Sequence, residues 1–262
     1  MAFSLAQTKL FLLDMDGTFY LGDTLLPGAL EFWELCRRQG IGCVFLTNNS
    51  SRGADAYLRR LRGMGVPHLK AEQIFTSADA TLLYLAEHHI GPEVLLIGTP
   101  SLEEQFAAAG YCLGAAGAKA VVLGFDTTLT YGKLTVLCQA VAAGLPYIAT
   151  HPDRNCPMPG GFIPDIGATI AYVEASTGRR PDAVIGKPNA YIAEAAARRY
   201  GCAVEELCMV GDRLYTDIAL GKCGCGTVLV LSGESRREDL VAAEHQPDLV
   251  CRDLAELCTY LG

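Results

Sequence analysis

The sequence predicts an α/β fold with a doubly wound, mainly parallel sheet. Short apolar runs alternate with segments of helical composition along the chain, as expected of βαβ units. Runs such as Phe11-Leu12-Leu13 and Leu229-Val230-Leu231 are apolar at successive positions. Strands covered on both faces have this composition, which is typical of parallel sheets. With 262 residues, half of them hydrophobic, the chain is long enough to bury a sizeable core.

Seven strands and seven helices are expected, mostly in alternation. Periodicity indicates the short strand-like runs, and helical composition with plausible end signals indicates the helices. The strands are expected at residues 9–14, 42–47, 93–98, 120–125, 146–150, 208–212 and 227–231. The helices are expected at residues 28–39, 52–64, 77–89, 132–144, 167–177, 189–200 and 214–221.

Composition argues against several classes of protein. The formal net charge of −8 is unsuited to binding nucleic acid through its phosphates. No run approaches eighteen apolar residues, and the N-terminus lacks the features of a signal peptide, so neither a membrane span nor secretion is expected. The eleven cysteines are odd in number and none has Cys-x-x-Cys spacing. They are expected to be reduced, which favours a cytoplasmic location.

Two carboxylates follow the first predicted strand. Asp14 and Asp16 come directly after this apolar run, and Gly17 lets the chain turn sharply behind them. Polar residues at the carboxyl end of a parallel strand face the crevice where open α/β sheets bind ligands. Carboxylates there can bind a divalent cation, and one can attack phosphorus. An ordinary strand-to-turn transition is the simpler alternative.

Three further segments end predicted strands with groups suited to a phosphate ester. Thr47 and Asn48 offer a hydroxyl and backbone amides before a helix, with an N-cap as the alternative. Lys187 lies between a strand and a helix, where its ammonium can offset phosphate charge. Asp212 would complete an oxygen-rich Mg²⁺ site, and Asp217 could orient the lysine or a metal-bound water.

The order and form of these segments resemble the haloacid dehalogenase superfamily of phosphatases. The four motifs of that superfamily are similar here to Asp14-Met15-Asp16-Gly17-Thr18, Thr47, Lys187, and Gly211-Asp212 with Asp217. The 140 residues from Thr47 to Lys187 exceed what the core requires. This excess resembles the large α/β cap of the NagD-like and p-nitrophenyl-phosphatase-like subgroup. Further similarities to the subgroup are Leu46-Thr47-Asn48-Asn49-Ser50, Ile148-Ala149-Thr150-His151-Pro152-Asp153 and Gly186-Lys187-Pro188.

The resemblance implies a domain organisation. Residues 1–78 and 179–262 would form a Rossmann-like catalytic core, and residues 79–178 an inserted α/β cap that selects the substrate. The strands at 120–125 and 146–150 should then build a sheet of their own. Members of the subgroup often form homodimers through the cap, so a homodimer is an expectation from the resemblance alone.

In the resembling subgroup, the stretch corresponding to Thr150–Ile163 of the cap contacts the part of the substrate that is not phosphate, so selectivity is expected there, with a solvated connector as the alternative. His151 stands where the subgroup commonly has Asn or Asp, and a structural loop histidine is the alternative. Arg154 could pair with a second anionic group of the substrate. The candidate selectivity residues are His151, Asp153, Arg154 and Asn155.

The resemblance also implies a mechanism for a small phosphorylated metabolite, such as a sugar phosphate or a nucleoside monophosphate. Asp14 attacks phosphorus and forms an aspartyl phosphate, while Asp16 protonates the leaving group and then activates water. Mg²⁺ is held by Asp14, the backbone carbonyl of Asp16, and Asp212. The phosphoryl group is bound by Thr47, Asn48 and Lys187.

Two other functions are left open by the sequence. Phosphoryl transfer to a sugar or another acceptor occurs in phosphomutases that share this core, and only acceptor assays would separate it from hydrolysis. A phospho-acceptor signalling module also combines Asp, Thr and Lys on a parallel sheet, but such receiver domains are shorter and have no cap. A nucleotide-dependent kinase is disfavoured because no Gly-x-x-x-x-Gly-Lys-Ser/Thr loop occurs.

Overall fold

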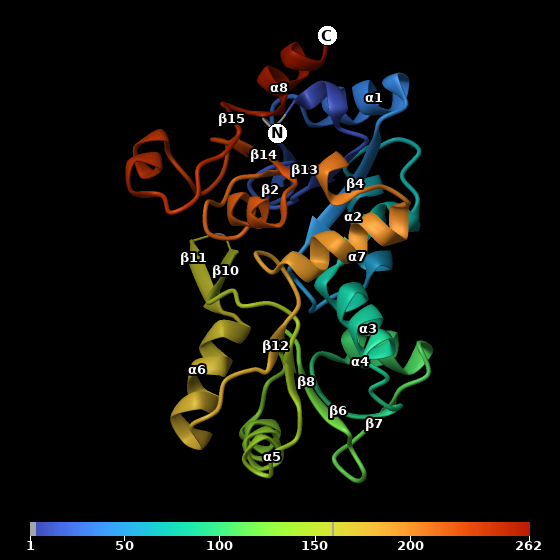
Figure 1. Cartoon of the computed structure of the whole chain (residues 1–262), viewed down its shortest axis with the longest axis vertical. Helices are drawn as coiled ribbons and strands as arrows, with labels where there is room; N and C mark the ends of the chain where they lie inside the picture. Colours follow the sequence, from blue (N-terminus) through green and yellow to red (C-terminus); the bar gives the residue numbers. More distant parts are fainter. Residues whose placement is uncertain (1–3, 159) are drawn as a thin grey trace. The chain divides into compact units, whose positions relative to one another are not determined.

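Two parallel sheets organise the chain, each within a compact unit of its own (Figure 1). The computed structural model describes residues 4–158 and 160–262. The first unit contains residues 4–47, 55–75 and 187–262. The second contains residues 48–54 and the described part of 76–186.

The first unit is built on a six-stranded sheet in the order β15-β14-β13-β1-β4-β5. The strand β1 pairs in parallel with β13 and β4, so that Leu12 lies beside Met209 and Val44. All four residues of β1 are buried, as an uninterrupted apolar run predicts. The strands are β1 (Leu10–Leu13), β4 (Gly42–Thr47), β5 (Ile74–Thr76), β13 (Leu207–Gly211), β14 (Gly226–Val230) and β15 (Leu249–Cys251).

The helices of the first unit pack an apolar face against this sheet or against each other. Helix α1 (Ala29–Gln39) buries Phe32 and Trp33, and the Phe32 ring meets Phe11 of β1 edge-on, with ring centroids 5.1 Å apart. Helices α1 and α8 lie side by side (Figure 1). The other elements are α2 (Ala54–Gly63), α7 (Ala190–Tyr200), α8 (Leu254–Leu261), the 3₁₀ helices η1 (Leu5–Gln7), η2 (Ala71–Gln73), η3 (Val204–Glu206), η4 (Ile218–Cys223) and η5 (Arg237–Ala242), and the hairpin of β2 (Tyr20–Leu21) and β3 (Thr24–Leu25).

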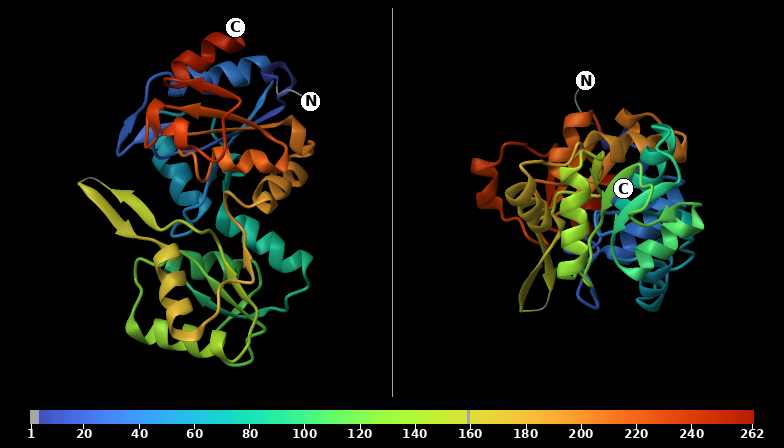
Figure 2. Two further views of the ribbon diagram at one scale, coloured as in Figure 1. Left: turned by 60° about the vertical axis from the view of Figure 1, so that its left-hand side comes forward. Right: turned by 90° about the horizontal axis from the view of Figure 1, so that it is seen from below.

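The second unit has a five-stranded parallel sheet in the order β12-β9-β8-β6-β7. Leu123, Tyr147 and Ile166 belong to its apolar core, to which α5 and α6 contribute one buried face each. Figure 2 shows the hairpin of β10 and β11 projecting beyond this sheet. The elements are α3 (Ser77–Glu87), β6 (Glu93–Ile97), α4 (Pro100–Ala108), β7 (Cys112–Leu113), β8 (Ala120–Leu123), α5 (Tyr131–Ala142), β9 (Tyr147–Ala149), β10 (Asn155–Met158), β11 (Gly161–Pro164), α6 (Ile166–Thr177) and β12 (Ala183–Val184).

The predicted fold class is confirmed, and each of the seven expected strands is present. The strands expected at 120–125 and 146–150 are β8 and β9. They lie in a different sheet from β1 and β13, as the long interval between Thr47 and Lys187 predicts.

Three helices differ from expectation: the one expected at 214–221, and α4 and α8, which are absent from the expected set. The helix expected at 214–221 is confirmed only in its second half and as a 3₁₀ helix, because residues 214–217 form a turn and η4 spans Ile218–Cys223. A Cβ on Gly221 would lie 2.9 Å from Thr227 Cγ2 of β14, and this close approach suits the narrower 3₁₀ helix. Helix α4 is absent from the expected set, although Thr99 caps it and Pro100 stands at its first position. Both are ordinary signals for a helix start.

Two expectations from composition also bear on the fold. Among the described residues, no helix combines the length and the apolar character needed to cross a membrane. Cys36, Cys43 and Cys208 are buried thiols, as expected of reduced core cysteines.

Candidate active site

Asp14, Thr47 and Asp212 stand at one edge of the six-stranded sheet. They end or directly follow β1, β4 and β13, which are parallel neighbours. The carboxyl ends of these strands therefore meet, as in the ligand sites of open α/β sheets. Lys187 joins them from far along the chain, with its Nζ 2.6 Å from Asp14 Oδ1.

The turn after β1 brings the first motif against Asp212. Gly17 has a φ of +89°, and a Cβ at this position would lie 2.4 Å from Asp212 Oδ2. Only glycine fits there, because both the backbone conformation and the space exclude a side chain. The Thr18 hydroxyl donates a hydrogen bond to Asp212 Oδ1 at 3.5 Å. Gly17 and Thr18 of the first motif both lie against Asp212 of the fourth motif, and this proximity explains why a glycine and a hydroxyl residue stand there.

Lys187 is the buried cation of the candidate site. Its Nζ lies 2.6 Å from Asp14 Oδ1 and 2.7 Å from Asp217 Oδ1, and it donates a hydrogen bond to the Leu46 carbonyl at 3.2 Å. Burial alone would lower the pKa of Lys187, but the two carboxylates outweigh it and raise the pKa above its ordinary value. The ammonium therefore stays charged between its acidic partners.

Asp14, Asp212 and Asp217 form a compact group of carboxylates. Each can offer one oxygen, and these oxygens lie within 4.8 Å of one another. Burial raises the pKa of Asp14 to about 8 although Lys187 opposes the shift, and burial together with Asp217 raises the pKa of Asp212 to about 7. A divalent cation would relieve this crowding of negative charge. Because carboxylate oxygens are the donors that hard divalent cations take in proteins, the group fits a metal site.

Asp16 lies next to this group in sequence, but its side chain is not a member of it. The side chain is exposed, and its Oδ2 accepts a hydrogen bond from the Tyr20 hydroxyl at 3.2 Å. This placement is compatible with a metal contact through the backbone carbonyl of Asp16. Tyr20 is absent from the residues predicted from sequence.

Arg213 and Glu234 also contact the site and are absent from the sequence prediction. The Arg213 amide donates to Asp217 Oδ2 at 3.1 Å, and the Glu234 amide donates to Asp212 Oδ2 at 2.7 Å. The Arg213 Nε and a Glu234 carboxylate oxygen lie 2.9 Å apart. Glu234 lies in the turn after β14, the neighbour of β13, and its contact with Asp212 comes from the backbone amide, so no side-chain pattern in the sequence indicates it.

Thr47 and Asn48 are adjacent in sequence but are assigned to different units. Thr47 is the last residue of β4 and is buried. The side-chain amide of Asn48 donates to Asp153 Oδ1 at 3.0 Å within the second unit. A phosphate contact from Asn48 would therefore come from its backbone.

Known proteins match this chain over nearly its whole length. Two family models match it, one described as haloacid dehalogenase-like hydrolase at residues 11–112 and one as HAD-hydrolase-like at residues 184–257. A Bacillus subtilis (strain 168) protein named 5'-nucleotidase YutF is 34% identical over 254 residues, which are 97% of this chain and 98% of the relative. The chain belongs to the haloacid dehalogenase-like hydrolase family.

Two further matches place the chain within this family. A Staphylococcus aureus (strain MRSA252) protein named acid sugar phosphatase is 35% identical over 252 residues, covering 95% of this chain and 96% of the relative. The structure of a 4-nitrophenylphosphatase from Thermotoga maritima has a TM-score of 0.94 and 46% identity, covering 98% of each chain. NagD proteins are also among the matching structures. The chain is thus a haloacid dehalogenase-type phosphatase of the NagD-like and p-nitrophenyl-phosphatase-like subgroup, which confirms the resemblance seen in its motifs.

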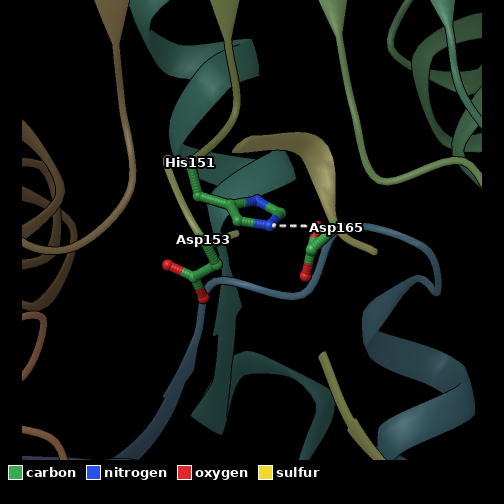
Figure 3. A group of neighbouring side chains, drawn as sticks. All are labelled: His151, Asp153 and Asp165. Carbon is green, nitrogen blue, oxygen red and sulfur yellow. Dashed lines mark hydrogen bonds and ion pairs between the residues drawn. The ribbon is translucent and has the colours of Figure 1, made fainter. Parts of the chain in front are cut away.

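In this haloacid dehalogenase-type enzyme, His151 belongs to a buried cluster of the second unit. Figure 3 shows its ring pointing toward Asp165, with Asp153 alongside. The His151 Nε2 lies 3.0 Å from Asp165 Oδ1, and its Nδ1 lies 3.1 Å from Thr150 Oγ1. The side chain is fully buried. An enclosed imidazole with both nitrogens engaged is the arrangement of a structural histidine, which is the alternative that the sequence left open.

Asp165 is absent from the sequence prediction, although a signal for it exists. It directly precedes α6, and its Oδ1 accepts a hydrogen bond from the Ile166 amide at 2.6 Å. An Asp before an apolar helical segment is a common N-cap. His151, Asp153 and Asp165 are close enough to share a metal ion, but their hydrogen bonds to each other and to Asn48 already account for their burial.

Arg154 and Asn155 differ from this cluster because both are exposed. Asn155 is the first residue of β10, and the Arg154 carbonyl accepts a hydrogen bond from the Asp165 amide at 2.9 Å. Pro159, which lies in the segment expected to select the substrate, falls outside the described residues. The two exposed side chains are accessible to a substrate group, whereas that of His151 is not.

Proposed function

We propose that this enzyme hydrolyses small-molecule phosphate monoesters with Mg²⁺ through an aspartyl phosphate formed on Asp14. The position of the Asp14 carboxylate carries this proposal. It lies 2.6 Å from Lys187 Nζ, and one of its oxygens lies within 4.8 Å of oxygens of Asp212 and Asp217. A nucleophile, a cation and metal-binding acids therefore converge at one edge of the sheet.

In the first step, an Asp14 oxygen forms a bond to phosphorus as the bond from phosphorus to the leaving oxygen breaks. Asp16 gives its proton to that leaving oxygen. Lys187 and the Thr47 hydroxyl bind the phosphoryl oxygens, together with the backbone amide of Asn48. The buried ammonium of Lys187 is held in place for this contact by Asp217 at 2.7 Å.

In the second step, water attacks the phosphorus of the aspartyl phosphate. Asp16 is now ionised and takes a proton from this water. The bond between the Asp14 oxygen and phosphorus breaks, so the free carboxylate and inorganic phosphate are released. The exposed side chain of Asp16 suits a group that exchanges protons with both the leaving group and water.

The residues that would hold Mg²⁺ are Asp14, Asp212 and the backbone carbonyl of Asp16. When bound, the cation would offset the negative charge of the phosphoryl group and of the acids whose ionisation burial disfavours. Asp217 is ion-paired with Lys187 and would act by orienting that lysine.

We propose a sugar phosphate or a nucleoside monophosphate as the substrate class. The relative named acid sugar phosphatase is 35% identical and the relative named 5'-nucleotidase is 34% identical, so identity does not choose between the two classes. Residues 79–178 are proposed as the cap that selects the substrate, with the exposed Arg154 and Asn155 as contacts and the buried His151 and Asp153 as their support.

A homodimer formed through the cap and a cytoplasmic location are further proposals. The first rests on the subgroup, and the second rests on the cysteine content of the chain. The net charge of −8 argues against a nucleic-acid partner.

A substrate screen with the purified protein tests the proposed function. The protein is incubated with Mg²⁺ and a panel of sugar phosphates, nucleoside monophosphates and p-nitrophenyl phosphate, and released inorganic phosphate is measured. We expect hydrolysis of several esters, its loss with excess EDTA, and its return when Mg²⁺ is restored. Full turnover in EDTA would contradict the metal assignment. Transfer of phosphate to an added sugar in preference to water would identify a phosphoryl transferase instead.

A further inference from the structure

We propose that the Tyr20 hydroxyl is a positioning group for Asp16, anchoring through Oδ2 the carboxyl group that exchanges protons with the substrate. The inference rests on the proposed function, in which Asp16 acts first as an acid and then as a base. It uses only contacts within the first unit.

The contact that carries this inference joins an exposed acid to a buried phenol. The Tyr20 hydroxyl donates to Asp16 Oδ2 at 3.2 Å. The Tyr20 side chain is fully buried, whereas Asp16 is exposed. Burial and the nearby Asp16 carboxylate both raise the pKa of Tyr20. The phenol therefore keeps its proton at ordinary pH and presents a donor to the carboxylate.

Backbone hydrogen bonds fix Tyr20 beside the turn that holds Asp16. The Gly17 amide donates to the Tyr20 carbonyl at 2.8 Å, and the Tyr20 amide donates to the Met15 carbonyl at 3.1 Å. These bonds tie Tyr20 to the residues on either side of Asp16. Movement of the tyrosine backbone relative to the acid would break at least one of them.

The Tyr20 ring is held from its other side as well. The guanidinium of Arg60, from α2, lies over the ring at 4.5 Å from the ring centroid, and its Nη2 donates to the Gly22 carbonyl at 2.7 Å. Tyr20 also pairs with Leu25 in the β2–β3 hairpin. The Arg60 contact and burial therefore hold the ring, and strand pairing holds the backbone, so the direction of the Tyr20 hydroxyl is set before substrate binds.

This arrangement anchors one oxygen of the Asp16 carboxyl group, Oδ2. In the first step, the carboxyl group gives its proton to the leaving oxygen as the bond from phosphorus to that oxygen breaks. In the second step, the carboxylate takes the proton from the attacking water. Tyr20 keeps its own proton throughout. Without the Tyr20 hydroxyl, this anchor is lost, and a smaller fraction of molecules holds the carboxyl group toward the leaving group.

The test is the leaving-group dependence of the variant Tyr20→Phe, measured on the full-length protein with Mg²⁺. An alkyl phosphate needs proton donation to its leaving oxygen, whereas the p-nitrophenolate of p-nitrophenyl phosphate leaves readily without it. We expect the ratio of kcat/KM for the alkyl ester to that for the aryl ester to fall about tenfold or more, part of the ~10²–10⁴ that general acid catalysis supplies. The ratio is insensitive to partial unfolding, because the folded fraction cancels.

Two controls separate this role from a structural one. Tyr200→Phe also removes one tyrosine hydroxyl, whose bond to the Glu72 carbonyl is 2.7 Å long, and should leave the ratio unchanged. In an Asp16→Asn background, Tyr20→Phe should cause no further fall in the ratio, because the group it positions is gone.

Each outcome decides between two conclusions. If Asp16→Asn lowers the ratio but Tyr20→Phe does not, or if Tyr20→Phe lowers kcat/KM equally for both esters, the positioning role is overturned and the proposed function stands. If Asp16→Asn itself leaves the ratio unchanged, Asp16 is not the acid, and both the assignment and the role of Tyr20 fail.

Discussion

At the scale of single residues, the ionisation of Asp14 depends on its cationic neighbours. Burial raises the pKa of Asp14 to about 8 even with the Lys187 ammonium 2.6 Å away. A carboxylate must be ionised to attack phosphorus. A divalent cation bound by Asp14 and Asp212 would therefore favour the ionised form of the Asp14 nucleophile, and it would also offset the negative charge of the substrate phosphate.

Replacing Asp14 by Asn is expected to lower kcat/KM by at least ~10³-fold, because an amide is a much weaker nucleophile and a poorer Mg²⁺ ligand. Steady-state kinetics on p-nitrophenyl phosphate with Mg²⁺ measure this. Asp182→Asn makes the same change at an exposed ion pair with Arg179 in the second unit and should retain activity. A folded, metal-loaded Asp14→Asn enzyme with a tenth of the original activity would exclude Asp14 as the nucleophile.

Arg154→Ala is expected to change the ranking of phosphate esters. The exposed guanidinium can pair with a second anionic group on some substrates, so that class should lose about 1–3 kcal/mol of transition-state stabilisation in kcat/KM. A small generic ester such as p-nitrophenyl phosphate should be nearly unaffected. Measurement of kcat/KM across the panel checks this, and an equal change for every ester, or no change for any, would show that Arg154 does not contact the leaving group.

The sequence predicts the site residues that act at strand ends and misses those that act through partners. Asp14 and Asp212 directly follow the parallel neighbours β1 and β13, so their convergence follows from parallel topology. Lys187 follows β12 of the other sheet, so its position beside Asp14 does not follow from that topology. Tyr20 and Glu234 contact the site through hydrogen bonds that depend on the exact turns after β1 and β14. Such contacts produce no periodic pattern in the sequence from which they could be predicted.

At the scale of elements, the glycines at the two ends of α1 have different tasks. Gly28 and Gly40 both have positive φ, at +80° and +71°. A Cβ on Gly28 would lie 2.0 Å from the Ala255 amide nitrogen of α8, whereas a Cβ on Gly40 would meet nothing within 4 Å. The first glycine therefore permits the contact between α1 and α8, and the second only permits the helix to end.

This difference makes a matched pair of variants. Gly40→Ala should cost about 1 kcal/mol from the left-handed backbone alone. Gly28→Ala adds a clash with the backbone of α8, which cannot rotate away, and should cost a further 1–3 kcal/mol or so. Thermal unfolding should therefore show a clearly lower midpoint for Gly28→Ala, and equal midpoints would contradict the close packing of the two helices.

Element length determines what the sequence can predict at this scale. The strands β1, β4, β8 and β13 have four or more buried residues each and stand out as apolar runs. The strands β7 and β12 have only two residues, too few for any alternation to show. These two short strands form only because they pair with longer neighbours, β7 with β6 and β12 with β9.

At the scale of the whole molecule, the second sheet could be predicted but the limits of the second unit could not. The long interval between Thr47 and Lys187 indicates an inserted domain. The segment Asn48–Ala54 also belongs to the second unit, where Ser50 shares a hydrogen bond of 3.0 Å with Thr150 and accepts another from the Phe125 amide. Because Thr150 is 100 residues and Phe125 is 75 residues away from Ser50 in sequence, no local pattern reveals these partners.

The covalent intermediate tests the central proposal most directly. The enzyme and its Asp16→Asn variant are mixed with p-nitrophenyl phosphate and Mg²⁺, quenched in acid within the first turnover, and digested for peptide mass spectrometry. Asp16→Asn is included because loss of the base should slow hydrolysis of the intermediate and let it accumulate. We predict one phosphoryl group on the peptide that contains Asp14, dependent on Mg²⁺ and absent from Asp14→Asn. A phosphoryl group on another residue, or none while p-nitrophenolate is released in a burst, would contradict the proposed mechanism.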